Sequence, residues 1–199
     1  MSVQKIKTYF EKASSNYQEQ SKSFPWNILR YFEYSTFSKN FHFNNNVNIL
    51  EIGAGVGFYS DQIIIKKPSS YTCIDVSSKM LSQIKSKSIK KICVDFNDFK
   101  SSDRYDIILC LGVVEFFESP ADSLQKIYEL LASKGRAYFY FPKKNLLGRL
   151  YFWMHKKNGF EITLFHKKEY RKELERLSFR IEFEKRIGFF NSLVCVSKQ

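Results

Sequence analysis

The chain is poor in the residues that mark fibrous or linker-like proteins. Its 199 residues include only 8 Gly and 4 Pro, which excludes collagen-like repeats and long Gly- or Pro-rich linkers. No apolar stretch reaches the roughly 18 residues that a membrane helix needs, and the N-terminus begins with a polar amphipathic segment instead of the apolar part of a signal peptide. We therefore expect a single domain in a reducing, cytoplasmic setting.

The four cysteines lack the spacing of metal ligands. Cys73, Cys93, Cys110 and Cys195 lie far apart, and each sits inside an apolar run typical of a strand. We expect four buried thiols. Because no Cys-x-x-Cys pair or Cys/His cluster is present, the sequence predicts neither a metal site nor a disulfide framework.

Charge and aromatic content are what the chain has in excess. The formal net charge is +12 and aromatic residues make up 17% of the sequence. The charge favours an acidic partner, which leaves open a phosphate-bearing substrate, nucleic acid, an acidic carrier protein or an anionic membrane. The lysines are dispersed in pairs such as Lys66-Lys67 and Lys156-Lys157, which is typical of a solvated surface and does not favour nucleic acid. The aromatic rings are numerous enough to line a pocket.

The middle of the chain alternates short apolar runs with helical stretches at 57–66, 77–87 and 120–133. Continuous runs such as 107–111 are typical of parallel strands covered on both faces, so the pattern indicates a doubly wound α/β sheet. The connection between the last two strands is so short that they must form an antiparallel hairpin. The seven predicted strands are 47–52, 71–75, 91–94, 105–111, 136–141, 180–187 and 192–197.

Both ends of the chain depart from this alternation. Residues 4–40 have two apolar stripes at helical spacing, which predicts helices before the sheet. The segment 143–166 is rich in large apolar residues and interrupts the step from the fifth strand to a charged helix at 167–177. An insertion at that point can cover a site at the strand ends.

Three features at the ends of the first three strands point to a bound nucleoside. A loop with Gly53, Gly55 and Gly57 follows the first strand and opens a helix, where the chain can turn tightly and present free N–H groups. Asp75 ends the second strand, where a carboxylate can accept hydrogen bonds from both hydroxyls of a ribose. Asp95 ends the third strand and is placed to meet an adenine edge, with Phe96 beside it.

Residues 47–142 resemble the class I S-adenosylmethionine-dependent methyltransferases. The resemblance rests on the acidic-x-G-x-G-x-G loop at 51–57, on Ile-Asp-Val-Ser at 74–77, on Tyr-Asp-Ile-Ile at 105–108 and on Gly-Val-Val-Glu at 112–115. The loop differs from the G-x-G-x-x-G fingerprint of nicotinamide-binding proteins. The terminal hairpin also resembles the antiparallel strand of this family. The resemblance implies a Rossmann-like sheet of seven strands with S-adenosylmethionine as the cofactor.

The resemblance also implies roles for individual residues. Glu51 would support the loop and help to bind the methionine end, Asp75 would hold the ribose, and Asp95 would hold the adenine amino group. Leu111 and Gly112 would approach the transferable methyl. The cofactor-binding residues that the resemblance implies are Tyr17, Glu51, Gly53, Ala54, Gly55, Gly57, Asp75, Val76, Met80, Asp95, Phe96, Leu111 and Gly112.

The N-terminal helices resemble the lid of small-molecule members of the family, with Tyr17 over the cofactor. The organisation we expect is a helical lid at 1–44, a cofactor-binding core at 45–142, an aromatic cap at 143–166, and a helix with the terminal hairpin at 167–199. The acceptor pocket would be walled by Trp26, Phe116, Phe152 and Trp153.

Methyl transfer from a sulfonium needs alignment of acceptor, methyl and sulfur more than it needs a metal or a nucleophile. A hydroxyl or ammonium acceptor must also lose a proton, and the candidate bases are Glu115, His155 and His166. Many relatives carry Glu-His after the fourth strand, but here Phe116 follows Glu115, so a role of that histidine does not carry over.

The sequence thus predicts a methyltransferase for a small, aromatic or lipid-like acceptor, by O- or N-methylation. Three alternatives stay open. The +12 charge is compatible with an RNA methyltransferase, although no RNA-binding motif is present. A nicotinamide-dependent reductase is disfavoured by the loop. A non-catalytic nucleoside-binding protein, or one that contacts a membrane surface through 146–154, is the third.

Overall fold

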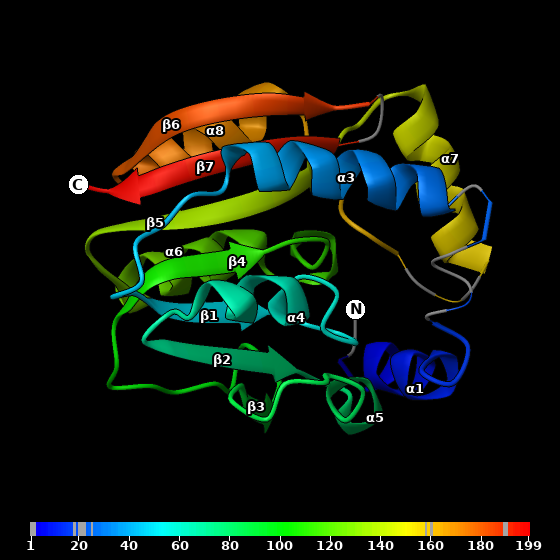
Figure 1. The fold of residues 1–199 in the computed structure, drawn as a ribbon. Helices are drawn as coiled ribbons and strands as arrows, with labels where there is room; N and C mark the ends of the chain where they lie inside the picture. Colours follow the sequence, from blue (N-terminus) through cyan, green and yellow to red (C-terminus); the bar gives the residue numbers. More distant parts are fainter. Residues whose placement is uncertain are drawn as a thin grey trace.

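A seven-stranded mixed sheet forms the centre of the protein (Figure 1). The computed structural model describes residues 3–17, 19, 23–24, 26–157, 159, 161–188 and 191–199. The strand order is β3-β2-β1-β4-β5-β7-β6, and β7 runs antiparallel to both of its neighbours. The predicted fold class is therefore confirmed. The strands are β1 (Asn48–Ile52), β2 (Ser70–Asp75), β3 (Lys90–Cys93), β4 (Tyr105–Cys110), β5 (Leu131–Pro142), β6 (Phe179–Ile187) and β7 (Asn191–Lys198).

Helices cover both faces of the sheet. In Figure 1, α3 and α4 lie in front of it, while α6 and α8 lie behind. Three further helices, α1, α5 and α7, lie beyond the ends to which β1, β2 and β4 point. The helices are α1 (Val3–Ala13), α3 (Trp26–Asn40), α4 (Ser60–Ile63), α5 (Ser78–Leu81), α6 (Pro120–Leu130), α7 (Leu146–Lys157) and α8 (Lys167–Arg176), with 3-10 turns η1 (Ile64–Lys66) and η2 (Val114–Phe116).

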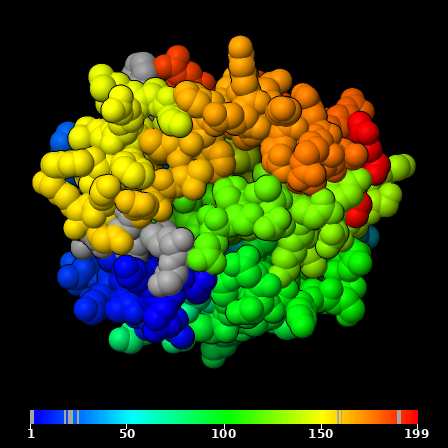
Figure 2. Space-filling view, turned by 180° about the vertical axis from the view of Figure 1, so that it is seen from behind, coloured from blue at the N-terminus to red at the C-terminus, as the bar shows by residue number. Residues whose placement is uncertain are grey.

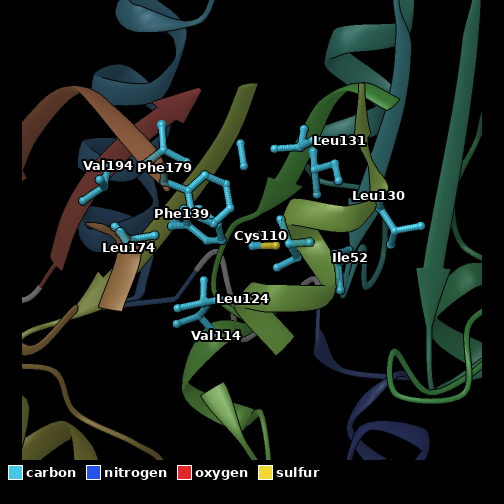
Figure 3. Packing of buried hydrophobic residues seen from close by; sticks show 14 of the residues in the cluster. Ile52, Cys110, Val114, Leu124, Leu130, Leu131, Phe139, Leu174, Phe179 and Val194 are labelled. Atoms are coloured by element: carbon cyan, nitrogen blue, oxygen red, sulfur yellow. The ribbon is translucent and has the colours of Figure 1, made fainter. Parts of the chain in front are cut away.

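The core consists of two apolar layers, one on each face of the sheet, because successive residues of a strand point to opposite faces. Ile107 of β4 packs in the layer with Phe37 of α3, and its neighbour Ile108 packs in the layer with Leu124 of α6. Figure 3 shows part of this second layer, with Phe139 between strands and helices. Burial on both faces explains why the parallel strands appear in the sequence as continuous apolar runs.

Two local expectations are wrong. The helix expected over 77–87 ends at Leu81, because the carboxylate of Asp61 accepts hydrogen bonds from the backbone N–H groups of Lys85 and Ser86 and holds the chain in a turn. Cys93 is exposed, because it ends β3, which is an edge strand of the sheet. The other three cysteines are buried as expected. In the described part of the chain, no helix has the length and apolar character that a membrane crossing requires.

Candidate active site

The loop between β1 and α4 holds three glycines in the left-handed region, with φ of 68° at Gly53, 53° at Gly55 and 82° at Gly57. A Cβ on Gly53 would lie 2.6 Å from Cγ2 of Val113, and one on Gly57 would lie 2.8 Å from Cγ1 of Ile84. Among the described residues, a Cβ on Gly55 would meet nothing within 4 Å. Packing therefore requires Gly53 and Gly57, whereas Gly55 leaves open space beside the backbone.

A cleft lies at the carboxyl ends of β1 to β4, where open α/β sheets bind ligands. Gly112, two residues beyond the end of β4, is a second open position, since φ is 85° and a Cβ there would meet no atom of the described residues within 4 Å. Figure 2 shows the blue N-terminal part of the chain, which includes α1, packed beside green segments from the middle of the chain. The residues expected to bind a cofactor that line the cleft are Tyr17, Gly53, Gly55, Asp75, Val76, Met80, Asp95, Phe96 and Gly112.

The carboxylate of Asp75 is held between the glycine loop and the start of α5. Oδ2 accepts a hydrogen bond of 2.9 Å from the backbone N–H of Gly55, and Oδ1 accepts one of 2.9 Å from that of Ser77. Ser77 caps α5, because its hydroxyl accepts from the N–H of Met80. Burial raises the pKa of Asp75. Each carboxylate oxygen can accept further hydrogen bonds, so Asp75 can still receive two donors from a ligand in the cleft.

Asp95 and Phe96 form the next part of the wall. Oδ1 of Asp95 accepts a hydrogen bond of 2.8 Å from the backbone N–H of Asn97, which also lines the cleft. The ring of Phe96 is stacked on that of Phe117, with centroids 5.6 Å apart. The ammonium group of Lys126 lies 4.9 Å from the centroid of the Phe96 ring and donates to the backbone oxygen of Phe96. This side of the cleft thus offers a fixed carboxylate next to an aromatic wall.

Helix α1 closes the cleft from outside. Its carboxylate Glu11 faces the start of α5, where it accepts from the hydroxyl of Ser78 at 3.4 Å and lies 3.9 Å from the ammonium of Lys79. Gln83 donates to the backbone oxygen of Ser14 just after the helix. The sequence indicated an amphipathic helix here but not what its apolar stripe packs on. The cleft residues that the sequence did not single out are Val3, Ile6, Phe10, Ile52, Ile74, Val94, Asn97, Val113, Phe117 and Glu118.

Four of the residues expected to bind a cofactor are not among those that line the cleft: Glu51, Ala54, Gly57 and Leu111. Glu51 is buried beside the apolar layer under α3, where it accepts a hydrogen bond of 2.8 Å from the hydroxyl of Tyr71. Burial raises the pKa of Glu51 to about 7. Leu111 belongs to the apolar layer under α3.

A second hollow of about 620 Å³ adjoins the cleft, within the ~300–1,000 Å³ range of small-molecule sites. The two share Phe116, Phe117 and Glu118 as a common wall. From the insertion, α7 contributes Phe152 and Lys156. Of the four residues expected to wall an acceptor pocket, Phe116 and Phe152 are therefore next to the cleft. The remaining lining residues are Lys5, Gly159, Glu161, Ile162 and Thr163.

Behind the shared wall lies a buried polar cluster. Oε1 of Glu115 accepts a hydrogen bond of 3.3 Å from the hydroxyl of Tyr151 in α7, and Oε2 has no hydrogen-bond partner within the part of the chain that the structure describes. Burial raises the pKa of Glu115 to about 7. Arg30 of α3 donates to the hydroxyl of Tyr17 at 2.9 Å and to Glu33 at 3.4 Å. Tyr17 therefore connects this cluster to the cleft.

Of the histidines and tryptophans expected at the site, only His155 contacts the shared wall in the described structure. The ring of His155 packs edge-on against Phe116, with centroids 5.8 Å apart, and burial lowers the pKa of His155 to about 4. His166 is exposed in front of α8 and lines neither hollow. Trp26 packs on Tyr151, while Trp153 is 51% exposed. Neither tryptophan is among the residues that line the two hollows.

Comparison with known proteins agrees with this geometry. Residues 50–137 match the family model described as a methyltransferase domain. A malonyl-[acyl-carrier protein] O-methyltransferase of Priestia megaterium is 32% identical over 107 residues, which are 51% of this chain and 39% of that protein. The corresponding enzyme of Bacillus anthracis is 23% identical over 106 residues. The chain thus matches about two fifths of the length of these curated relatives.

Solved structures extend the likeness in fold to nearly the whole chain. Magnesium protoporphyrin IX methyltransferase from Synechocystis, solved with S-adenosylhomocysteine, superposes with a TM-score of 0.77 at 15% identity, covering 98% of each chain. The methyltransferase of Haloferax volcanii solved with the Trm112 activator has a TM-score of 0.82 at 12% identity, covering 94% of this chain and 96% of that one. Residues 50–137 therefore match a methyltransferase domain, and nearly the whole chain has the fold of these solved methyltransferase structures.

Proposed function

We propose that this protein transfers the methyl group of S-adenosylmethionine to an oxygen or nitrogen of a small acceptor with an apolar body. The observation that carries the proposal is the cleft in which Gly55 and Gly112 leave open space beside the backbone, next to the carboxylates of Asp75 and Asp95. When bound, S-adenosylmethionine supplies an electrophilic methyl on a sulfonium. The fit is supported by a relative of the same fold that was solved with the demethylated product.

Each wall of the cleft has a function in this proposal. Asp75 would accept hydrogen bonds from the two ribose hydroxyls, since its oxygens keep acceptor capacity beyond their two backbone donors. Asp95 would accept from the adenine amino group, with the stacked pair Phe96 and Phe117 against the base. Open backbone at Gly55 and Gly112 allows the methionine end to approach closely. Helix α1 would exclude water above the reacting groups.

The second hollow is the place that we propose for the acceptor. It shares Phe116 and Phe117 with the cleft, so a ligand there would lie next to the methyl donor. Phe152 and Ile162 add apolar surface, while two basic residues, Lys5 and Lys156, and two acidic residues, Glu118 and Glu161, supply charge of both signs. This combination suits an apolar acceptor with a polar end.

Glu115 is the strongest candidate for taking a proton from the acceptor. It lies one residue before the shared wall at Phe116, although it lines neither hollow itself, and one oxygen of its buried carboxylate lacks a partner in the described structure. With a pKa raised to about 7, it can accept a proton near neutral pH. His155 lies behind the same wall with a pKa lowered to about 4, so it is a weaker base.

Calorimetric titration with S-adenosylhomocysteine, together with transfer of a labelled methyl to extract fractions, tests the proposal. Asp75→Ala should weaken binding by roughly 1–3 kcal/mol, while Asp106→Ala should leave it unchanged. Asp106 is the matched control, because its carboxylate accepts from the backbone N–H of Asn48 at the other end of β1. Equal affinity of both variants and the wild type would contradict the ribose contact. Transfer to RNA in preference to small molecules would contradict the proposed acceptor.

A further inference from the structure

The large apolar side chains exposed on the described part of the protein are gathered on two segments. Single exposed apolar residues are normal on any soluble protein, but a group of them marks an interaction surface. Only Phe58 and Ile65 lie outside the two segments. The grouped residues are Phe24, Ile28, Tyr31 and Phe32, before and within α3, and Leu146, Leu150 and Trp153 of α7.

On α7 the exposed residues form one stripe. Leu146, Leu150 and Trp153 are spaced by four and three positions, which places them on the same face of a helix. Their exposed fractions are 82%, 51% and 51%. The opposite face of α7 meets the protein, since Gly148 is buried and Tyr151 reaches Glu115. Helix α7 therefore packs one face on the protein and, within the described residues, exposes a second apolar stripe.

Helix α3 begins beside α7 and carries a second group of exposed apolar residues. Ile28, Tyr31 and Phe32 also share one helix face. The ring of Trp26 at the start of α3 packs on that of Tyr151 in the middle of α7, with centroids 6.3 Å apart. Figure 1 shows α7 beside the first turns of α3. The two exposed stripes thus belong to the same end of the molecule.

The charged residues of α7 itself are all basic, and one of them, Lys156, lies 3.2 Å from Glu161 outside the helix. The helix carries Arg149, Lys156 and Lys157 and no acidic residue. The ammonium group of Lys157 lies 3.7 Å from the centroid of the Trp153 ring, beside the apolar stripe. A helix with exposed Leu and Trp residues on one side and basic residues beside them is the type that lies in the surface of an anionic bilayer.

We propose that the exposed apolar residues of this end of the molecule dock on an anionic lipid surface. This α3–α7 face consists of Phe24, Ile28, Tyr31, Phe32, Leu146, Leu150 and Trp153. A membrane fits better than an acidic protein, because separate Leu, Ile, Phe, Tyr and Trp side chains project outward while the basic groups lie beside them. The position has a consequence for the acceptor. Phe152 and Lys156 of the same helix line the second hollow, so docking would bring that hollow to the lipid surface and let an apolar acceptor enter from it.

Flotation with vesicles of phosphatidylcholine alone, and with added phosphatidylglycerol, tests the proposal. We expect binding to the anionic vesicles only. The double variant Leu150→Ser with Trp153→Ser should reduce that binding about tenfold or more. Ile65→Ser, the control, should not reduce it. Ile65 is 75% exposed, but it lies in η1, outside the two segments. Lys156→Gln with Lys157→Gln should weaken binding to anionic vesicles without removing any apolar contact.

Titration with S-adenosylhomocysteine on every variant shows whether it is folded and keeps the cleft, so this result is separate from the proposed methyl transfer. Absence of wild-type binding to anionic vesicles would overturn the inference. Equal binding of the wild type and the Leu150/Trp153 variant would also overturn it. Binding to soluble polyglutamate that matches binding to vesicles, with no loss in the Leu150/Trp153 variant, would instead indicate an acidic protein partner and reject the lipid surface.

Discussion

A pair of glycine substitutions separates ligand binding from backbone strain. Gly55 and Gly188 have nearly the same φ, 53° and 49°, and a Cβ on either would meet no atom of the described residues within 4 Å. Gly55 lies in the cleft, and Gly188 lies at the β6–β7 hairpin. We expect Gly55→Leu to abolish binding of S-adenosylhomocysteine and Gly188→Leu to leave it intact.

The magnitudes follow from the shared conformation. A side chain in the left-handed region costs roughly 1–2 kcal/mol, which in a chain of this size lowers the unfolding midpoint by about 2–8 °C. Both variants should lose this amount. Only Gly55→Leu places a side chain in the space that the ligand needs, so its affinity should fall at least about 100-fold, or roughly 2.7 kcal/mol.

Scanning calorimetry measures the first quantity and titration calorimetry the second. Gly53→Ala provides an internal contrast, because its Cβ would lie 2.6 Å from Val113 and should cost more stability than either open position. The reasoning is refuted if folded Gly55→Leu binds S-adenosylhomocysteine within about threefold of the wild type, since the loop would then not face the ligand.

Two further predictions concern the acid and the acceptor wall. Burial raises the pKa of Glu115 from 4.5 to about 7, so the folded state binds this proton more tightly than the unfolded state, and stability should fall as the pH rises from about 4.5 to 7. Glu115→Gln should make the unfolding midpoint fall less over that range, while exposed Glu175→Gln should not, and an unchanged pH profile in Glu115→Gln would show that the carboxyl is not buried. Phe152→Ser removes a wall of the second hollow and should lower kcat/KM for a small acceptor about tenfold or more with cofactor affinity unchanged. For a water-soluble acceptor, Trp153→Ser should have no such effect, and equal loss in both variants would place the acceptor elsewhere.

Local patterns in the sequence were sufficient to predict the sheet. Each central strand is a continuous apolar run because it is buried on both faces, and the short step from 187 to 191 permits only a hairpin. The glycine loop and the two carboxylates were also predictable, because parallel strands bring their carboxyl ends to one edge. Nine residues expected to bind a cofactor consequently line one cleft. The helix over 77–87 was predicted too long, because the carboxylate that ends it, Asp61, comes from another element.

The direction of individual side chains depended on the tertiary structure. The sequence treats Gly53, Gly55 and Gly57 alike, yet Val113 and Ile84 make two of them packing positions and leave one open to the cleft. Cys93 is exposed because nothing pairs with the outer edge of β3 in the described structure.

The same holds for residues outside the loop. Glu51 lies in β1, the strand that the loop follows, but its carboxylate accepts a hydrogen bond from Tyr71 and does not line the cleft. Trp153 and Phe152 are adjacent in the aromatic insertion, and the packing of α7 turns one outward and the other into the second hollow. The hydrophobic period and the composition of a segment determine whether it forms a helix or a strand, because that choice depends on near neighbours in the chain. Which side of each element meets a ligand is decided by partners that are distant in sequence.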